Sequence, residues 1–243
     1  MLAIRYIEKV QQLIEQCKSQ SEAITEGAKL ISNAIKDDGV FHVFGCGHSQ
    51  MYAEEIFYRA GGLVPVNPIL EPSLSLRPSA PKSTWFERLE GYASLIWDNE
   101  ETRPGEVVLI ASTSGRNAVP IEMAFEAKKR GMFVIALTSS FFSEGVESRH
   151  PSGKKLQDVA DVILDGKAPK GDAVMELPAL GPKFGPVSSV VGFTLIQALV
   201  VEVVDKLVHE GIAPPIWVSS NLDEGDAVNR EHIKAYKKRI TCL

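Results

Sequence analysis

The sequence predicts an α/β protein with a central parallel sheet covered by helices on both faces. Three observations indicate this fold class. Short apolar segments alternate with helical patterns along most of the chain. The short segments are apolar throughout, which is typical of strands buried on both faces. The 243 residues are 44% hydrophobic and 23% charged, a balance that suits an ordinary domain with a sizeable core.

The chain begins with two predicted helices, separated by a break at residues 19–21. Apolar residues recur at helical spacing on both sides of the break: Ile4, Ile7, Val10, Leu13 and Ile14 before it, and Ile24, Ala28, Ile31 and Ile35 after it. We expect residues 1–243 to form a single domain. In it, residues 1–36 are an N-terminal helical extension and residues 37–243 are the core.

Strands and helices then alternate. Strands are expected at residues 40–44, 63–66, 106–111, 133–137, 162–164 and 216–218. Helices are expected at residues 49–60, 118–130, 187–209 and 228–239. The proline-rich segment 71–82 is expected to be a loop, and the aromatic residues Trp85, Phe86 and Trp97 to be core or interface residues. The pattern predicts a central parallel sheet of about five strands.

Charge and composition argue against several function classes. The net charge of −5 disfavours non-specific nucleic-acid binding, which needs a basic face. Three scattered cysteines are too few for a disulfide framework or a zinc site, so we expect a reducing compartment and a cytoplasmic protein. The amphipathic N-terminus lacks the apolar core of a signal peptide, and the apolar segment 187–209 carries charged side chains. No membrane association is therefore expected.

Two loops carry the clearest functional signal. Residues 45–49 read Gly-Cys-Gly-His-Ser, and residues 111–117 read Ala-Ser-Thr-Ser-Gly-Arg-Asn. Each follows a predicted strand and opens a predicted helix. Ligands of parallel sheets bind outside the carboxyl ends of the strands, and a helix N-terminus with nearby hydroxyls suits an anion. The candidate phosphate-binding residues are Gly47, Ser49, Ser112, Thr113, Ser114 and Asn117.

The common nucleotide motifs do not fit these loops. The position of the third glycine of a dinucleotide fingerprint is Gln50, and there is no GxxxxGK[ST] sequence. The alternative is that the glycines only make a tight turn and Ser49 only caps a helix. Hydroxyl-bearing loops at two strand ends favour the anion site.

The two loops resemble those of the SIS (sugar isomerase) domain of phosphosugar isomerases and phosphosugar-binding proteins. The STSG tetrad is similar to that of phosphoheptose isomerase, and the resemblance runs from about residue 26 to residue 239. It implies a three-layer sandwich with a five-stranded parallel sheet, in which Ser49, Ser112, Thr113 and Ser114 hold a sugar phosphate. Asn117 stands where the family usually has Ser or Thr, so its side chain could instead cap the following helix.

Candidate groups for acid–base chemistry are few. His48 lies inside the first loop, and Glu54 lies on the helix after it. His150 lies in a polar segment that, by resemblance to related proteins, could reach the pocket of a neighbouring subunit. Each has a simpler alternative: a phosphate contact for His48, a helix-surface position for Glu54 and a solvent loop for His150. Ser188 and Ser189 open the long helix, where one is expected to be the N-cap and either could reach a sugar hydroxyl.

Some family features do not transfer. The glutamate that the family's isomerases and etherases often place later on the first helix is replaced here by Tyr58 and Arg59, and Glu55 is expected to pair with Arg59 across one helical turn. Gln197 and His209 lie too far apart to join in a metal site. We expect no metal and no other cofactor.

Three functions remain open at this point. The first is an aldose–ketose sugar-phosphate isomerase, which we favour. The second is a non-catalytic phosphosugar-binding sensor, which the absence of a helix-turn-helix segment before the SIS region disfavours. The third is a sugar-phosphate lyase or etherase. The expected partners are a small-molecule sugar phosphate and further copies of the chain, as a dimer or tetramer. The long apolar helix at residues 187–209 and the amphipathic N-terminus suggest this assembly, and the resemblance implies a pocket near a subunit boundary.

Overall fold

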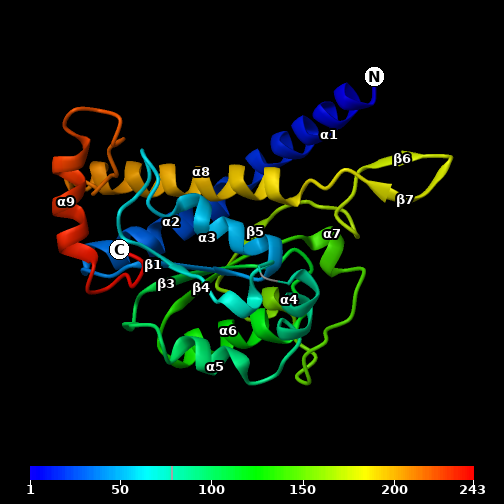
Figure 1. The fold of residues 1–243 in the computed structure, drawn as a ribbon, viewed down its shortest axis with the longest axis horizontal. Coiled ribbons are helices and arrows are strands. Elements are labelled where there is room, and N and C mark those ends of the chain that lie inside the picture. Colours follow the sequence, from blue (N-terminus) through cyan, green and yellow to red (C-terminus); the bar gives the residue numbers. More distant parts are fainter. Residues whose placement is uncertain (78) are drawn as a thin grey trace.

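The computed structural model describes residues 1–77 and 79–243 and shows three layers (Figure 1), with helices on both faces of a central sheet. The sheet is parallel, in the order β2-β1-β3-β4-β5. Its strands are β1 (Phe41–Gly45), β2 (Val66–Ile69), β3 (Val107–Ala111), β4 (Phe133–Thr138) and β5 (Val162–Asp165). The predicted fold class is confirmed.

Successive residues of each strand pack on opposite faces of this sheet. On β3, Leu109 joins the core under α2 (Ser21–Lys36), α3 (Met51–Ile56) and α8 (Ser188–His209). The next residue, Ile110, joins the core under α5 (Tyr92–Trp97) and α6 (Ala118–Lys129). Because both faces are covered, the central strands are fully buried and their sequences carry no polar alternation.

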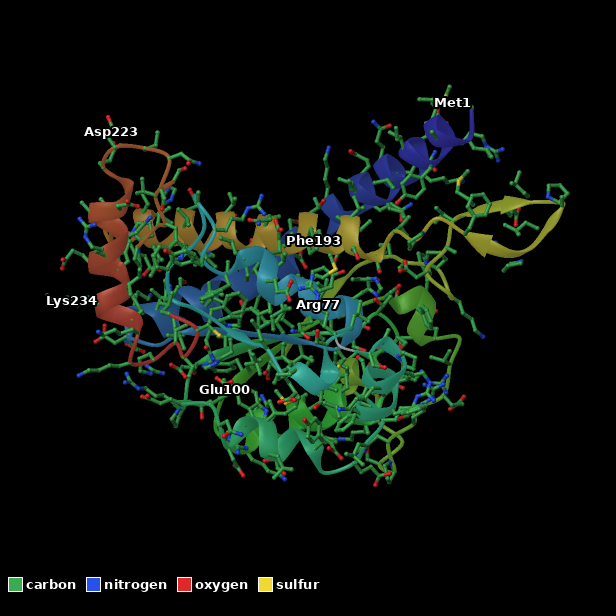
Figure 2. The ribbon with its side chains drawn as sticks, viewed as in Figure 1. Met1, Arg77, Glu100, Phe193, Asp223 and Lys234 are labelled. Carbon is green, nitrogen blue, oxygen red and sulfur yellow. The ribbon has the colours of Figure 1, made fainter. Side chains whose placement is uncertain are left out.

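The remaining elements lie around these layers. Figure 1 shows α1 (Leu2–Cys17) extending away from the sheet near the hairpin of β6 (Met175–Leu177) and β7 (Leu180–Phe184), and Figure 2 labels Met1 at its far end. The other elements are α4 (Ala80–Phe86), α7 (Ser140–Ser143), α9 (Gly225–Tyr236) and the 3-10 turns η1 (Lys18–Gln20), η2 (Gly47–Gln50), η3 (Pro72–Leu74) and η4 (Leu156–Asp158).

The helix expected at residues 49–60 is shorter than predicted. It consists of η2 and α3 and ends at Ile56, because the backbone at Phe57 is extended and Tyr58 adopts φ +49°. The ring of Tyr58 packs edge-on against Trp217, with ring centroids 4.6 Å apart. A contact with the C-terminal part of the chain thus ends a helix that the local pattern would have continued.

Other segments also differ from the prediction. The segment 216–218 is not a strand of the sheet: Ile216 makes only an isolated bridge to Leu63, and the strand expected at residues 63–66 begins at Val66. The segment 71–82 is not all loop, since η3 lies within it and α4 begins before it ends. Of the aromatic residues expected in the core or an interface, Trp97 is buried in the core and Phe86 packs against it partly buried, and Trp85 is 70% exposed in the single chain.

Further elements were not predicted at all, namely α5, α7 and the β6–β7 hairpin, and the last helix begins at Gly225 and not at residue 228. The two N-terminal helices, α6 and α8 lie where the apolar spacing placed them. Within residues 1–77 and 79–243, every helix is too short or too polar to cross a lipid bilayer.

Candidate functional site

The order of the sheet reverses direction between β1 and β3. From β1 the chain first adds β2 on one side, then β3, β4 and β5 on the other. The loops that follow the two flanking strands diverge at such a point and leave a crevice at the carboxyl edge of the sheet. Gly45 pairs in register with Ala111, so the loops at residues 45–49 and 111–117 leave the sheet at the same level.

A cavity of about 410 Å³ opens between these loops and the start of α8. It brings together His48 and every residue predicted to bind phosphate or sugar, namely Gly47, Ser49, Ser112, Thr113, Ser114, Asn117, Ser188 and Ser189. The other lining residues are Cys46, Tyr52, Leu76, Ser83, Thr84, Glu87, Phe142, Asp172 and Pro186.

The first loop is shaped by its glycines. Gly45 lies directly against the backbone of Ser49, so a Cβ at this position would overlap the Ser49 carbonyl. Gly47 has φ +58°, a conformation that residues with a Cβ rarely adopt. The Ser49 N–H then donates to the Cys46 carbonyl at 3.0 Å. The loop is therefore a tight turn, and the turn places Ser49 on the cavity wall.

The second loop is held by backbone hydrogen bonds to β4 and the residue after it. The Ser112 N–H donates to the Leu137 carbonyl at 2.9 Å, and the Thr113 carbonyl accepts from the Ser139 N–H at 3.1 Å. These bonds use backbone groups only, so the side-chain hydroxyls of Ser112, Thr113 and Ser114 stay available to a ligand in the cavity.

The N-terminus of α8 forms the third wall and is capped differently from the prediction. The helix begins at Ser188, and neither Ser188 nor Ser189 is its N-cap. Instead, Asp172 Oδ1 accepts from the N–H groups of Val187 (3.1 Å) and Ser188 (2.8 Å), and its Oδ2 accepts from Ser188 Oγ (2.6 Å). The cap comes from a distant segment, which the local sequence does not reveal.

Glu87 is a cavity residue that sequence reasoning missed. It follows α4, in a region where no helix was expected, and its carboxyl is half-buried on the cavity wall. Burial raises the pKa of Glu87, while a hydrogen bond from Asn117 and the charges of Arg88 and Arg149 act in the opposite direction. A carboxyl in a cleft whose pKa is raised by burial is a candidate for acid–base chemistry.

Asn117 occupies the N-cap position of α6, but its side chain does not cap the helix. Its Oδ1 instead accepts a hydrogen bond from Arg149 Nη1 at 2.8 Å. The alternative that Asn117 is the N-cap residue of the following helix is confirmed in position, but its side chain makes no capping hydrogen bond, because the guanidinium of a distant segment takes the amide oxygen.

Two predicted acid–base candidates lie outside this cavity. Glu54 lines a neighbouring cavity of about 390 Å³, together with Gln50 and Arg77. His150 Nδ1 lies 2.8 Å from Ser152 Oγ in the same loop. Within one chain, the structure thus leaves His48 as the only one of the three predicted acid–base candidates at the cavity.

The ion pair expected between Glu55 and Arg59 is confirmed, with Glu55 Oε1 at 2.6 Å from Arg59 Nη1. Cys46 is buried in the first loop, and burial, followed by the nearby charge of Glu87, raises the pKa of its thiol. Within the described ranges, no three His, Cys, Asp or Glu side chains come together as a possible metal site.

Residues 5–139 match the SIS domain family. A UPF0309 protein from Caldanaerobacter subterraneus subsp. tengcongensis is 45% identical over 242 residues, which cover 98% of each chain. A UPF0309 protein from Listeria monocytogenes serotype 4b (strain F2365) is 39% identical over 239 residues, 98% of this chain and 97% of the relative.

Solved structures show the same fold. Phosphoheptose isomerase from Francisella tularensis superposes with a TM-score of 0.52 at 18% identity, covering 84% of this chain and 96% of that one. Phosphoheptose isomerase from Neisseria gonorrhoeae superposes with a TM-score of 0.52 at 19% identity, covering 83% of this chain and 98% of that one. With the family match and these relatives, the chain is a member of the SIS domain family.

Proposed function

We propose that this protein binds a sugar phosphate in the 410 Å³ cavity and interconverts its aldose and ketose forms. The observation that carries the proposal is the position of Glu87. Its carboxyl, whose pKa is raised by burial, shares one cavity with two hydroxyl-bearing loops at the switch point of a SIS sheet. An anion site and a proton-transfer group thus lie within the span of one small ligand.

The phosphate is held by neutral donors in this proposal. The described residues that line the cavity include neither Lys nor Arg. The hydroxyls of Ser49, Ser112, Thr113 and Ser114, with the backbone at Gly47 and the N-terminus of α6, supply the hydrogen bonds. Ser188 and Ser189 face the sugar from the α8 side. The cavity volume is in the ordinary range for a small-molecule site.

Aldose–ketose isomerisation moves one proton between adjacent carbons of the open-chain sugar. In the proposed reaction, the Glu87 carboxylate removes the proton from C2 of the aldose, leaving an enediolate with its negative charge on O1. The proton of the O2 hydroxyl then passes to O1, and the Glu87 carboxyl returns its proton to C1, which leaves the C2 carbonyl of the ketose. His48, on the first loop, assists ring opening by proton exchange with the ring oxygen. The cycle needs both forms of this carboxyl: burial favours the protonated form, and the hydrogen bond from Asn117 and the charges of Arg88 and Arg149 favour the ionised one.

The first test is a thermal-shift screen with hexose, heptose and amino-sugar phosphates, each beside its free sugar. A ligand at about 100 times its dissociation constant stabilises the fold by about 2.7 kcal/mol. We expect one phosphosugar to stabilise the protein, its free sugar to have no effect, and Ser114→Ala to abolish the shift. If millimolar phosphosugars give no shift at all, the loops do not bind sugar phosphate.

The stabilising sugar is then incubated with the protein in D2O and followed by proton NMR. An isomerase produces the other sugar form with deuterium at C1 or C2. Glu87→Gln should bind the sugar but lose turnover, while Glu90→Gln, an exposed carboxyl close by, serves as the matched control. Binding without any reaction would identify a sensor, and loss of water or of an acid from C3 after the same proton removal would identify a lyase.

A further inference from the structure

We infer that Arg149 is a positioning residue for this site. It orients the side-chain amide of Asn117 so that the amide N–H points to the carboxyl of Glu87. The catalytic meaning of this relay rests on the proposed function, in which Glu87 transfers the proton. The relay itself is a structural relationship among three side chains and can be tested without any turnover.

The hydrogen bonds fix the direction of the amide. Arg149 Nη1 donates to Asn117 Oδ1 at 2.8 Å, which leaves the amide NH2 group on the other side of the side chain. Hydrogen bonding from the Asn117 side chain lowers the pKa of the Glu87 carboxyl, so the NH2 group lies toward that carboxyl. A primary amide has an acceptor on one side and a donor on the other. If it were rotated by half a turn, its NH2 group would face the guanidinium and its oxygen would face the carboxylate. Arg149 therefore selects the orientation that suits Glu87.

Backbone contacts hold the three residues beside one another. The Arg149 N–H donates to the Arg116 carbonyl at 2.8 Å, next to Asn117 in the second loop. The Glu87 carbonyl accepts from the Val119 N–H at 3.1 Å, in the first turn of α6. Asn117 is only 8% exposed, so water competes little for its amide. Backbone hydrogen bonds thus hold Arg149 and Glu87 in place, and burial shields Asn117 between them from water.

The charges around Glu87 come from several segments. Arg88, its neighbour in sequence, and Arg149 both lower its pKa, against the effect of burial. His48, Cys46 and Asp172 line the same cavity. Arg149 itself is close to Arg116 and Arg88, and burial followed by these two charges lowers the pKa of Arg149. Arg88 and Arg149 therefore share one electrostatic effect on Glu87, but only Arg149 also holds Asn117.

This difference supplies a matched pair of variants. Arg88→Gln removes a positive charge near Glu87 and leaves the Asn117 contact intact. Arg149→Gln removes a charge and also releases the amide oxygen of Asn117. Arg149→Lys keeps the charge but loses the planar guanidinium. Circular dichroism and thermal melting of each variant establish that it is folded before it is compared.

The test is an NMR titration of protein labelled with 13C at the glutamate carboxyls and 15N at the asparagine side chains. Glu87→Gln and Asn117→Ala assign the two signals. We expect the pKa of Glu87 to rise in both Arg88→Gln and Arg149→Gln. The Asn117 amide signals should move only in Arg149→Gln. Unchanged Asn117 signals in Arg149→Gln, or equal movement in Arg88→Gln, would show that Arg149 acts by charge alone and would overturn the inference.

Turnover, if found, gives an independent readout. A raised pKa of Glu87 moves the acid limb of the kcat/KM profile to higher pH, because less of the base is ionised at a given pH. Arg149→Gln should show this displacement and a loss in kcat of about 10-fold or more from misdirection of the carboxyl, with KM little changed. An active enzyme whose profile and kcat are unaffected by Arg149→Gln contradicts the inference. Absence of turnover in the wild type rejects the proposed function. In that case the NMR titration alone tests the contact between Arg149, Asn117 and Glu87.

Discussion

Gly192 lies directly beneath the phenol ring of Tyr52. A Cβ at position 192 would overlap the ring and its hydroxyl. The position is in the first half of α8, and the Tyr52 hydroxyl donates to the Ser188 carbonyl at 2.8 Å, one turn earlier in the same helix. Tyr52 also lines the cavity. A glycine inside a helix thus allows a ring from α3 to reach the N-terminus of α8 and support the cavity wall.

Gly192→Ala is therefore expected to destabilise the fold by about 1–3 kcal/mol, since the ring or the helix must shift. The sign is informative, because replacing a helical glycine by alanine without such a clash stabilises by about 1 kcal/mol. Urea unfolding measures the difference. Gly181→Ala, at a glycine with open space around its Cβ position, is the control and should change stability little. A more stable Gly192→Ala protein would refute the contact.

The second prediction concerns pH and Glu106, at the opposite edge of the sheet. Burial raises the pKa of this carboxyl, but hydrogen bonds from His42, Arg239 and the Val40 N–H outweigh it and bring the pKa to about 2. A lowered pKa stabilises the fold above the pKa of the unfolded chain, and this stability is lost as pH falls toward the folded value. The loss should occur between about pH 5 and pH 2 and amount to about 3 kcal/mol.

Urea unfolding at pH 7, 5, 4 and 3 measures this dependence. Glu106→Gln should be less stable at pH 7 and should lose less stability on acidification than the wild type. Glu22→Gln, at an exposed carboxyl of α2, should follow the wild-type curve. If the Glu106→Gln and wild-type curves fall in parallel, other carboxyls dominate acid unfolding.

The features that the sequence predicted correctly are those that depend on residues close together in the chain. Strands β1 and β3 bury side chains on both faces of the sheet, and the long helix α8 packs on one of these faces. This burial appears in the sequence as apolar runs and helical spacing. The two glycine-bearing loops could be found because their glycines meet local requirements of the backbone: Gly45 lies against Ser49 in the first loop, and Gly47 in the first loop and Gly115 in the second have positive φ. These features depend on neighbours in sequence, so a single sequence reveals them.

The missed features depend on distant partners. Tyr58 ends the α3 region early because it packs on Trp217, far along the chain. Asp172 caps α8 across 15 and 16 residues of sequence separation. Glu87 reaches the cavity because the short helix α4 packs beside η2 and η3, where Ser83 Oγ donates to the Leu74 carbonyl at 2.7 Å. The spacing of residues in the local sequence does not indicate any of these contacts. The cavity wall opposite the two loops, which includes Glu87 and Asp172, could therefore not be predicted.

The third prediction tests the cap made by Asp172. Asp172→Ala removes the acceptors of the Val187 and Ser188 N–H groups and should destabilise the fold by about 1 kcal/mol. Because Ser188 lines the cavity, the variant should also weaken phosphosugar binding in the thermal-shift assay. Asp172→Asn keeps one acceptor oxygen and tolerates the φ of +53° at this position, so its effects should be smaller. Equal losses of stability and of phosphosugar binding in the two variants would show that Asp172 acts through its carboxylate charge and not through the capping hydrogen bonds.

The last prediction concerns assembly. The outer face of α8 leaves Val201 67% exposed and Val208 56% exposed, two turns apart on the same side of the helix. Apolar side chains aligned in this way favour an interface, and we propose a dimer or tetramer that buries them. Light scattering after gel filtration should give a mass that is a multiple of the 26.5 kDa chain.

Val201→Glu should shift this mass toward that of one chain, because a carboxylate would be buried without a partner in the assembly. Leu95→Glu, on the opposite side of the sheet in α5 and 59% exposed, should leave the mass unchanged. A wild type that already runs as a single chain, or a Val201→Glu variant that assembles like the wild type, removes this face of α8 from the interface. In the second case, a mass change in Leu95→Glu would place the contact on the α5 side of the sheet.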